Sequence, residues 1–177
     1  MLRDFINIVG VDEARNFPVL TPLDRYKQFT AEELVTIPEV KPDMEQITTV
    51  MVEPTVTGYK VIATPTGVKV VVDVELLQKI IYTANEPTQP IHSAEFIRPF
   101  CNFIEVPLII PANSNIMKQL QILGLTLEDV IVGPPQILLE DLSIKMIDAR
   151  NVKKCGILFV WVALNPALTP LLPVTAI

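Results

Sequence analysis

The sequence predicts an all-β protein, mainly an antiparallel β-sandwich or barrel-like domain, with an extended N-terminal arm and at most one or two short helices. Valine, isoleucine and threonine make up 55 of the 177 residues, and their branched side chains suit a pleated strand better than a helix. The 16 prolines outnumber the 6 glycines, and proline breaks long helices and marks turns and strand ends. Hydrophobic alternation over residues 67–82 completes the case, because a period of two is typical of a strand with one buried face.

Residues 1–35 are predicted to form the N-terminal arm, because they lack clean alternation. Within the arm, residues 5–11 are apolar enough for a short strand. The pattern Thr30-Ala-Glu-Glu33 resembles a capping box, which indicates a short helix that begins at Thr30. Two prolines within residues 37–43 then force an extended path into the main domain, since each also restricts the residue before it.

The main β domain is expected over residues 36–164. Its first strands are predicted at 47–56 and 59–63. Residues 64–67 fit a type I turn, with proline in the second position and glycine in the fourth.

The strand predicted at 67–82 is the strongest local signal in the chain. One face carries Val70, Val72 and Val74 among other apolar side chains, and only Gln78 interrupts it. A strand of this length would span roughly 50 Å. We therefore expect a bulge or bend near Gln78.

The second half of the domain mixes strands with one helix. Residues 91–106 are predicted to form a strand pair, or one strand broken at Pro99. Asn115 would cap a short helix that runs through Leu123 and stops at a glycine. An antiparallel hairpin is expected to close the domain, with strands at 137–148 and 152–164.

The C-terminal residues 155–177 carry no charge, which leaves two interpretations, a membrane anchor or a buried strand followed by an apolar tail. Prolines interrupt the second half, and the continuous apolar stretch of 155–164 is too short to cross a bilayer as a helix. We therefore predict no membrane span, and a proline-containing tail at 165–177.

Composition excludes several classes of function. The net charge of −6 argues against a nucleic-acid partner, because phosphate contacts need surplus Lys and Arg. One histidine and two cysteines cannot supply the four ligands of a zinc site, and no phosphate-binding loop is present. We expect no cofactor and no metal. The N-terminus does not resemble a signal peptide, and two cysteines fit a protein made in a reducing cytosol.

Several stretches in order resemble the SPOCS domain, which is found in SipL-type spore-coat morphogenetic proteins and related clostridial spore-surface proteins. The stretches are Thr36–Ile47, Gly67–Leu76, Gln89–Phe96, Pro99–Pro107 and Leu139–Arg150. Together they cover roughly residues 36–163. The resemblance implies a non-catalytic β domain that acts by protein–protein contact on bacterial endospores. SipL-type proteins also carry a terminal LysM module, for which no room remains after residue 163, so the resemblance favours a free-standing structural unit.

Few residues are candidates for chemistry. His92 and Cys101 would be the base and nucleophile of an enzyme, but a spacing of nine puts them on opposite faces of a strand, so we expect a structural histidine and no catalytic residue. The acidic residues near 32–53 lack the spacing of a calcium loop, which favours a solvated or partner-facing acidic strip. Cys101 and Cys155 lie in apolar strands, either as buried free thiols or as an intersubunit or internal disulfide.

Charge is distributed unevenly, which suggests assembly patches. The acidic candidates are Glu32, Glu33, Glu39, Asp43 and Glu45, and the basic candidates are Lys145, Arg150, Lys153 and Lys154. Opposite patches on one chain suit head-to-tail contact between copies, which makes rings or filaments. The alternative is ordinary surface charge.

These observations, with the resemblance, predict a structural, self-assembling protein of the bacterial endospore surface, in the coat, the exosporium or an appendage. Its expected partners are copies of itself, in a layer or filament, and other spore coat proteins. The alternative is an adaptor module that docks another spore-coat morphogenetic protein, and a small enzyme is least supported. The chain is expected to be made in the mother-cell cytoplasm and deposited on the endospore surface.

Overall fold

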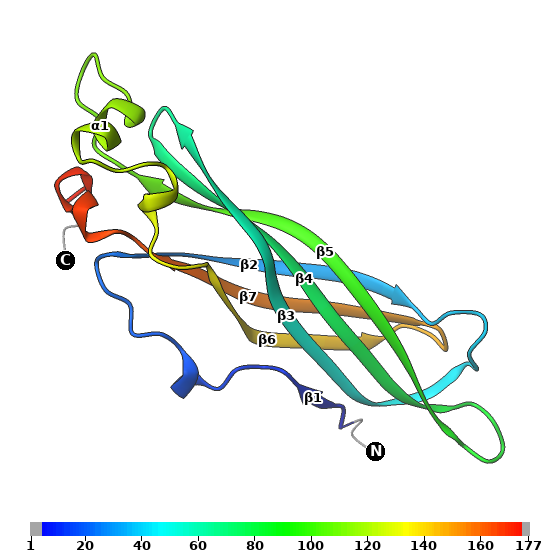
Figure 1. Ribbon diagram of the computed structural model, residues 1–177. Coiled ribbons are helices and arrows are strands. Elements are labelled where there is room, and N and C mark those ends of the chain that lie inside the picture. The colour runs from blue at the N-terminus through cyan, green and yellow to red at the C-terminus, as the bar shows by residue number, and fades with distance from the viewer. Residues whose placement is uncertain (1–4, 175–177) are drawn as a thin grey trace.

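The computed structural model describes residues 5–174, which form two stacked sheets in an elongated β-sandwich (Figure 1). Sheet A has the order β1-β3-β4-β5, with β1 (Asn7–Val9), β3 (Met44–Thr64), β4 (Gly67–Ala84) and β5 (Ile91–Pro107). Sheet B has the order β2-β7-β6, with β2 (Asp24–Thr36), β6 (Gln136–Met146) and β7 (Asn151–Ala163). The predicted all-β fold is confirmed.

β4 confirms the alternation read from the sequence. Val70, Val72 and Val74 are at most 1% exposed, and every second residue along the strand is buried in the same way. The expected bulge near Gln78 is wrong, because β4 pairs with both neighbours in unbroken register at this residue. The register shifts lie instead in β3, between Met44/Gln46, Ile47/Thr49 and Val56/Gly58.

β3 and β5 are each a single strand. The two strands predicted at 47–56 and 59–63 join across the bulge at Val56/Gly58. β5 continues through Pro99, which pairs with Glu75. Because β5 is the last strand of sheet A, proline can lie within it without removing a hydrogen bond from a central ladder.

Sheet B contains the predicted hairpin, β6–β7, and a strand that the sequence did not suggest. Every residue of β2 pairs with β7, so residues 24–35 of the expected arm are part of the sandwich. The helix suggested by the Thr30–Glu33 pattern is wrong, since these residues lie in mid-strand. Charged Lys27 and Glu33 occupy inward positions of β2, and they conceal its alternation in the sequence.

The hydrophobic core fills the space between the sheets, and short helical segments cover one end of it (Figure 1). α1 (Ile116–Ile122) begins as predicted at Asn115, whose side chain accepts a hydrogen bond from the backbone N–H of Lys118. Leu168 and Leu171 lie buried in the 3-10 helix η3 (Pro166–Leu171). This part of the expected tail therefore belongs to the core, while its last residues, 175–177, lie outside the described residues. No helix within residues 5–174 is long and apolar enough to cross a membrane.

Candidate assembly surfaces

The predicted acidic and basic patches meet each other within one chain. The antiparallel pairing of β2 with β7 brings the acids of one strand beside the lysines of the other. The ion pairs are Lys153–Glu32 (2.6 Å), Lys154–Glu33 (3.2 Å) and Arg150–Asp43 (2.6 Å). Among the described residues Glu39, Glu45 and Lys145 form no ion pair, and Glu45 accepts a hydrogen bond from Gln89. Six of the nine candidate charges are thus partnered internally rather than held apart for head-to-tail contact.

Glu33 is the centre of a polar cluster between the two sheets. Its Oε2 accepts hydrogen bonds from Gln78 Nε2 (2.9 Å) and Lys154 Nζ (3.2 Å), and Arg98 Nη1 lies 3.8 Å away. Gln78 is 2% exposed and the Lys154 side chain is 3% exposed. The cluster therefore explains how one amide and one ammonium group are tolerated in an apolar core.

The pKa values of this cluster reflect its burial. Desolvation acts to raise the pKa of Glu33, but the hydrogen bond from Gln78 and the charges of Lys154 and Arg98 outweigh it and hold the pKa below its ordinary value. Desolvation lowers the pKa of Lys154, and the Glu33 carboxylate only partly opposes this. The Glu33 carboxylate and the Lys154 ammonium face each other between the two sheets. Their role is therefore structural, and they do not face a partner.

Arg150 holds the proline-rich loop at residues 37–43. Its guanidinium donates to the carbonyls of Pro38 (3.1 Å) and Lys41 (3.1 Å) and pairs with the Asp43 carboxylate. The hydroxyl of Tyr82 donates to the carbonyl of Pro42 (3.1 Å). This loop is one of the stretches that resemble the SPOCS domain, and its path is fixed by these two side chains.

The sandwich has two long sides, and side chains close the one between β5 and β2. Arg98 on β5 donates to the carbonyl of Glu32 on β2 (3.1 Å). Phe29 and Phe100 pack edge to face, with ring centroids 5.5 Å apart, and Lys27 Nζ lies 4.1 Å from the centre of the Phe103 ring. Both edge strands on this side are therefore tied together by their own residues.

The other side, between β3 and β6, is covered by residues 6–12, which we call the N-terminal segment. Its strand β1 pairs in parallel with residues 49–51 of β3, and Asp12 then exchanges hydrogen bonds with Leu139 of β6. Ile6 and Val11 pack against the core from this side. Beside the segment is a groove of about 430 Å³, lined by Val9, Met51, Pro54 and Leu77 among others.

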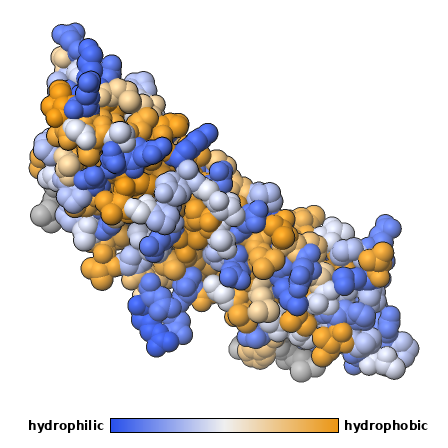
Figure 2. Space-filling model, in the orientation of Figure 1, coloured by the Kyte–Doolittle hydropathy of each residue, from blue (hydrophilic) through white to orange (hydrophobic). Residues whose placement is uncertain are grey.

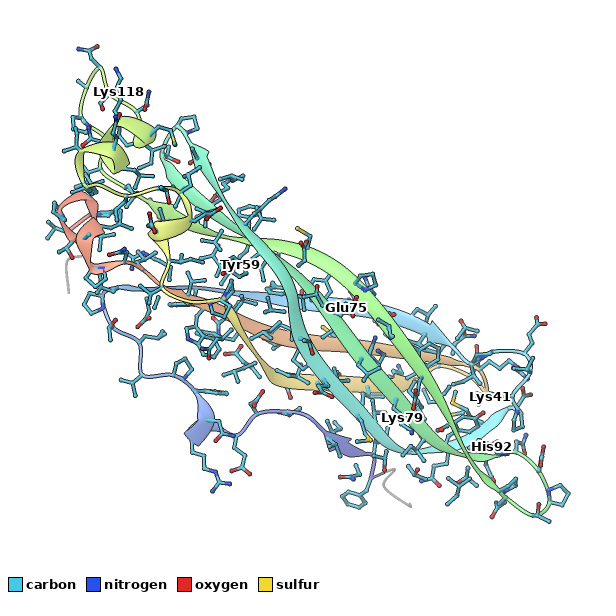
Figure 3. The ribbon with its side chains drawn as sticks, in the orientation of Figure 1. Lys41, Tyr59, Glu75, Lys79, His92 and Lys118 are labelled. Atoms are coloured by element: carbon cyan, nitrogen blue, oxygen red, sulfur yellow. The ribbon has the colours of Figure 1, made fainter. Side chains whose placement is uncertain are left out.

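The outer face of sheet A carries apolar side chains in neighbouring strands. Leu77 and Ile97 are directly paired in register and are 45% and 65% exposed, and Met51 on β3 is 40% exposed. We call these three residues the outer apolar patch. Figure 2 shows apolar side chains interspersed with polar ones over the visible face, and Figure 3 shows Glu75 and Lys79 on the same strand as Leu77.

The cysteines lie on opposite outer faces. Cys101 is exposed on β5, and Cys155 is half-buried on β7 between the inward-facing Lys154 and Gly156; both are free. The expectation of a buried thiol is therefore wrong for Cys101. Stacked sheets lie roughly 10 Å apart, so a bond within one chain would have to cross the sandwich, beyond the reach of a disulfide. Desolvation, and then the nearby Asp73 carboxylate, raise the pKa of the Cys101 thiol.

His92 and Cys101 do not form a site. His92 pairs in register with Tyr82, on whose ring it stacks with centroids 6.1 Å apart, whereas Cys101 pairs with Asp73 nine positions along the strand. Figure 3 shows His92 near the end of the sandwich that lies opposite the helical end. No group of three or more His, Cys, Asp or Glu residues within 5–174 is placed to hold a metal ion.

Sequence reasoning missed two of the features that connect the sheets, the polar cluster around Glu33 and the N-terminal segment. Gln78 was a usable signal, because a single amide on an otherwise apolar strand face calls for a buried partner. The pairing of Asp12 with Leu139 joins residues 127 positions apart and had no local signal.

Comparison with known proteins gave one family match. The family model described as "SipL, SPOCS domain" matches residues 43–122, which span β3, β4, β5 and α1. No curated protein and no solved structure showed significant similarity. Sheet A without β1 therefore corresponds to the matched region, and sheet B lies outside it. Residues 43–122 match the SPOCS-domain family that the sequence resembles, and this match indicates a sporulation-related protein.

Proposed function

We propose that this chain is a structural, self-assembling protein of the bacterial endospore surface, without catalytic activity, that acts through contacts between copies. It would be made in the mother-cell cytoplasm and deposited on the spore as part of the coat, the exosporium or an appendage. The family match supports the sporulation context.

The observation that carries the proposal is the outer apolar patch. Leu77 and Ile97 are directly paired and exposed, and Met51 is exposed diagonally from Leu77 on the neighbouring strand. A group of exposed apolar side chains on one sheet face supports protein–protein contact. The salt bridge between Lys79 and Glu95 (3.0 Å) borders the patch. An apolar centre with a polar border is the usual arrangement of a protein interface.

The alternative is an adaptor that docks another spore-coat morphogenetic protein. The free edge of β5 favours it, because within residues 5–174 no strand of sheet A pairs with the outer backbone groups of this 17-residue strand. An extended segment of a different protein could add to that edge as a further strand.

Electron microscopy of the purified protein, with size-exclusion chromatography and light scattering, tests the proposal. We expect a heat- and denaturant-resistant polymer. The double variant Leu77→Lys/Ile97→Lys should remain folded and stay monomeric, because it places two like charges in the outer apolar patch. Ile122→Lys is the matched control, since Ile122 is 75% exposed on α1, away from the patch. A monodisperse wild-type monomer would overturn self-assembly and favour the adaptor.

A further inference from the structure

The N-terminal segment is held to the body at few points. β1 has only three residues, all exposed, and they pair with Thr49, Val50 and Met51. Beyond β1, Asp12 donates its backbone N–H to the Leu139 carbonyl (2.8 Å), and its carboxylate accepts from the Leu139 N–H (3.0 Å). Ile6 and Val11 supply the apolar contacts. The segment therefore behaves as a short added strand that bridges β3 and β6.

The connection that follows it, residues 13–22, is a separate exposed linker. Its hydrogen bonds among the described residues are local, such as Asn16 N–H to the Glu13 carbonyl, and Val19 is 92% exposed. Figure 1 shows this stretch looping away from the sheets before β2 begins. Ten residues can extend over roughly 33 Å, so the linker could place the N-terminal segment beyond its own sandwich.

We propose that, in the assembled state, the N-terminal segment of each copy occupies the side between β3 and β6 of a neighbouring copy. The inference deepens the proposed function and rests on it. All contacts of residues 6–12 with β3, β6 and the core can be made identically by a second copy, so exchange loses none of them. Exchange of an identical element is a low-cost route to association.

The exchange also sets the geometry of the assembly. Each copy would donate one segment and accept one, at two different places on its surface. A contact between unlike surfaces that does not close into a ring generates an open filament. The groove beside β1 is lined by Val9 and Met51, so solvent reaches the outer margin of the docked segment, and the edge of β3 becomes available once the segment leaves.

The register of β1 provides a direct test. Val9 and Met51 are paired, and both are about 40% exposed, so the double variant Val9→Cys/Met51→Cys can form a disulfide that records where the segment is docked. Equal amounts of unlabelled and ¹⁵N-labelled chains would be unfolded together, refolded, allowed to assemble and oxidised. Mass spectrometry then identifies the peptides joined between positions 9 and 51. A hybrid peptide, with one labelled and one unlabelled half, can arise only from two different chains.

With exchange, roughly half of the joined peptides from sedimented polymer should be hybrid, because each copy receives its segment from a random neighbour. The monomer that remains in solution is the matched control and should give no hybrid peptide. Polymer that contains only unmixed peptides would overturn the exchange and leave the proposed self-assembly intact. A preparation that forms no polymer would overturn both, and electron microscopy of the wild-type chain separates that failure from an effect of the variant.

Discussion

Glu33 is the counter-charge of a buried cation, because its carboxylate accepts hydrogen bonds from both Gln78 and Lys154 between the two sheets. Lys153 and Lys154 lie next to each other in the chain, yet their ion pairs differ in kind. The Lys154 side chain is 3% exposed, whereas that of Lys153 is 53% exposed. An exposed pair contributes little to stability, while removal of one partner from a buried pair leaves an uncompensated charge.

Replacement of Glu33 by Gln should therefore destabilise the protein strongly. We expect a loss of about 3 kcal/mol in the free energy of unfolding, because the buried Lys154 ammonium loses its counter-charge. Glu32→Gln is the matched control on the same strand, and it should unfold close to wild type in urea. Adding Lys154→Met to Glu33→Gln should restore most of the stability. Equal midpoints for the Glu33 and Glu32 variants would contradict a buried role for Glu33.

The lowered pKa of Glu33 predicts that the stability of the folded protein depends on pH. The pKa of Glu33 in the folded protein lies below its ordinary value of 4.5, so its stabilising effect is present above about that pH and is lost as the pH falls through the folded pKa. The pKa values of exposed Glu32, Asp129 and Asp148 are lowered as well, by hydrogen bonds from Lys153, Thr126 and Asn151 respectively. Thermal unfolding followed from pH 7 downwards should show the midpoint falling below about pH 4.5. The fall should be shallower in Glu33→Gln, and an identical slope would rule out this assignment.

Among the elements, the N-terminal segment depends on one glycine. Gly10 has φ +108°, and a Cβ atom built there would lie only 1.8 Å from the carbonyl oxygen of Val52. The Cβ atom of any other residue at this position would clash with the Val52 carbonyl and push the segment away from β3. β1 is therefore held by backbone proximity that only glycine permits.

Gly10→Ala should release the N-terminal segment while the two sheets stay folded. We expect protease cleavage within residues 6–12 to rise on the order of tenfold, because these residues are held against β3 and β6 and cleavage follows the population of the open state. Circular dichroism should still report a β fold. Gly133→Ala is the control, since Gly133 also has a positive φ (+76°) but its Cβ would meet nothing within 4 Å. Unchanged cleavage in Gly10→Ala would show that the segment is held elsewhere.

The elements that the sequence predicted well are those whose pattern is local. β4, α1 and the β6–β7 hairpin each carry their signal within their own residues, as apolar alternation, a capping asparagine or two strands around a turn. The sequence did not predict β2, because its inward face holds the charged residues Lys27 and Glu33. Their partners, the Phe103 ring and Lys154, come from other strands and are brought close only by folding. The candidate charges were identified, but their mutual pairing depends on the register of β2 with β7, which charge patterning alone does not specify.

At the scale of the whole molecule, the two sheets present different outer faces. Sheet A carries the outer apolar patch and Cys101, whereas sheet B carries Cys155 beside the Lys153–Glu32 pair. The two long sides between the sheets are closed, one by side chains and the other by the N-terminal segment. Contacts between copies would therefore use the outer faces, the strand edges or an exchanged segment rather than the interior.

The position of the thiols predicts how assembled copies would cross-link. Because Cys101 and Cys155 point away from each other on opposite faces, any disulfide must join two copies, and a chain with two such thiols can extend a series. In assembled protein exposed to air, a non-reducing gel should show a ladder that reductant collapses. Oxidation should quicken as the pH rises, since the raised pKa of Cys101 keeps its thiol protonated at neutral pH and only the thiolate reacts.

In the single variants Cys101→Ser and Cys155→Ser, cross-linking should stop at dimers, because one thiol per chain can join only two copies. A ladder that persists in either single variant would have to arise from another linkage, and a monomer band in the wild type under both conditions would show that the thiols remain free.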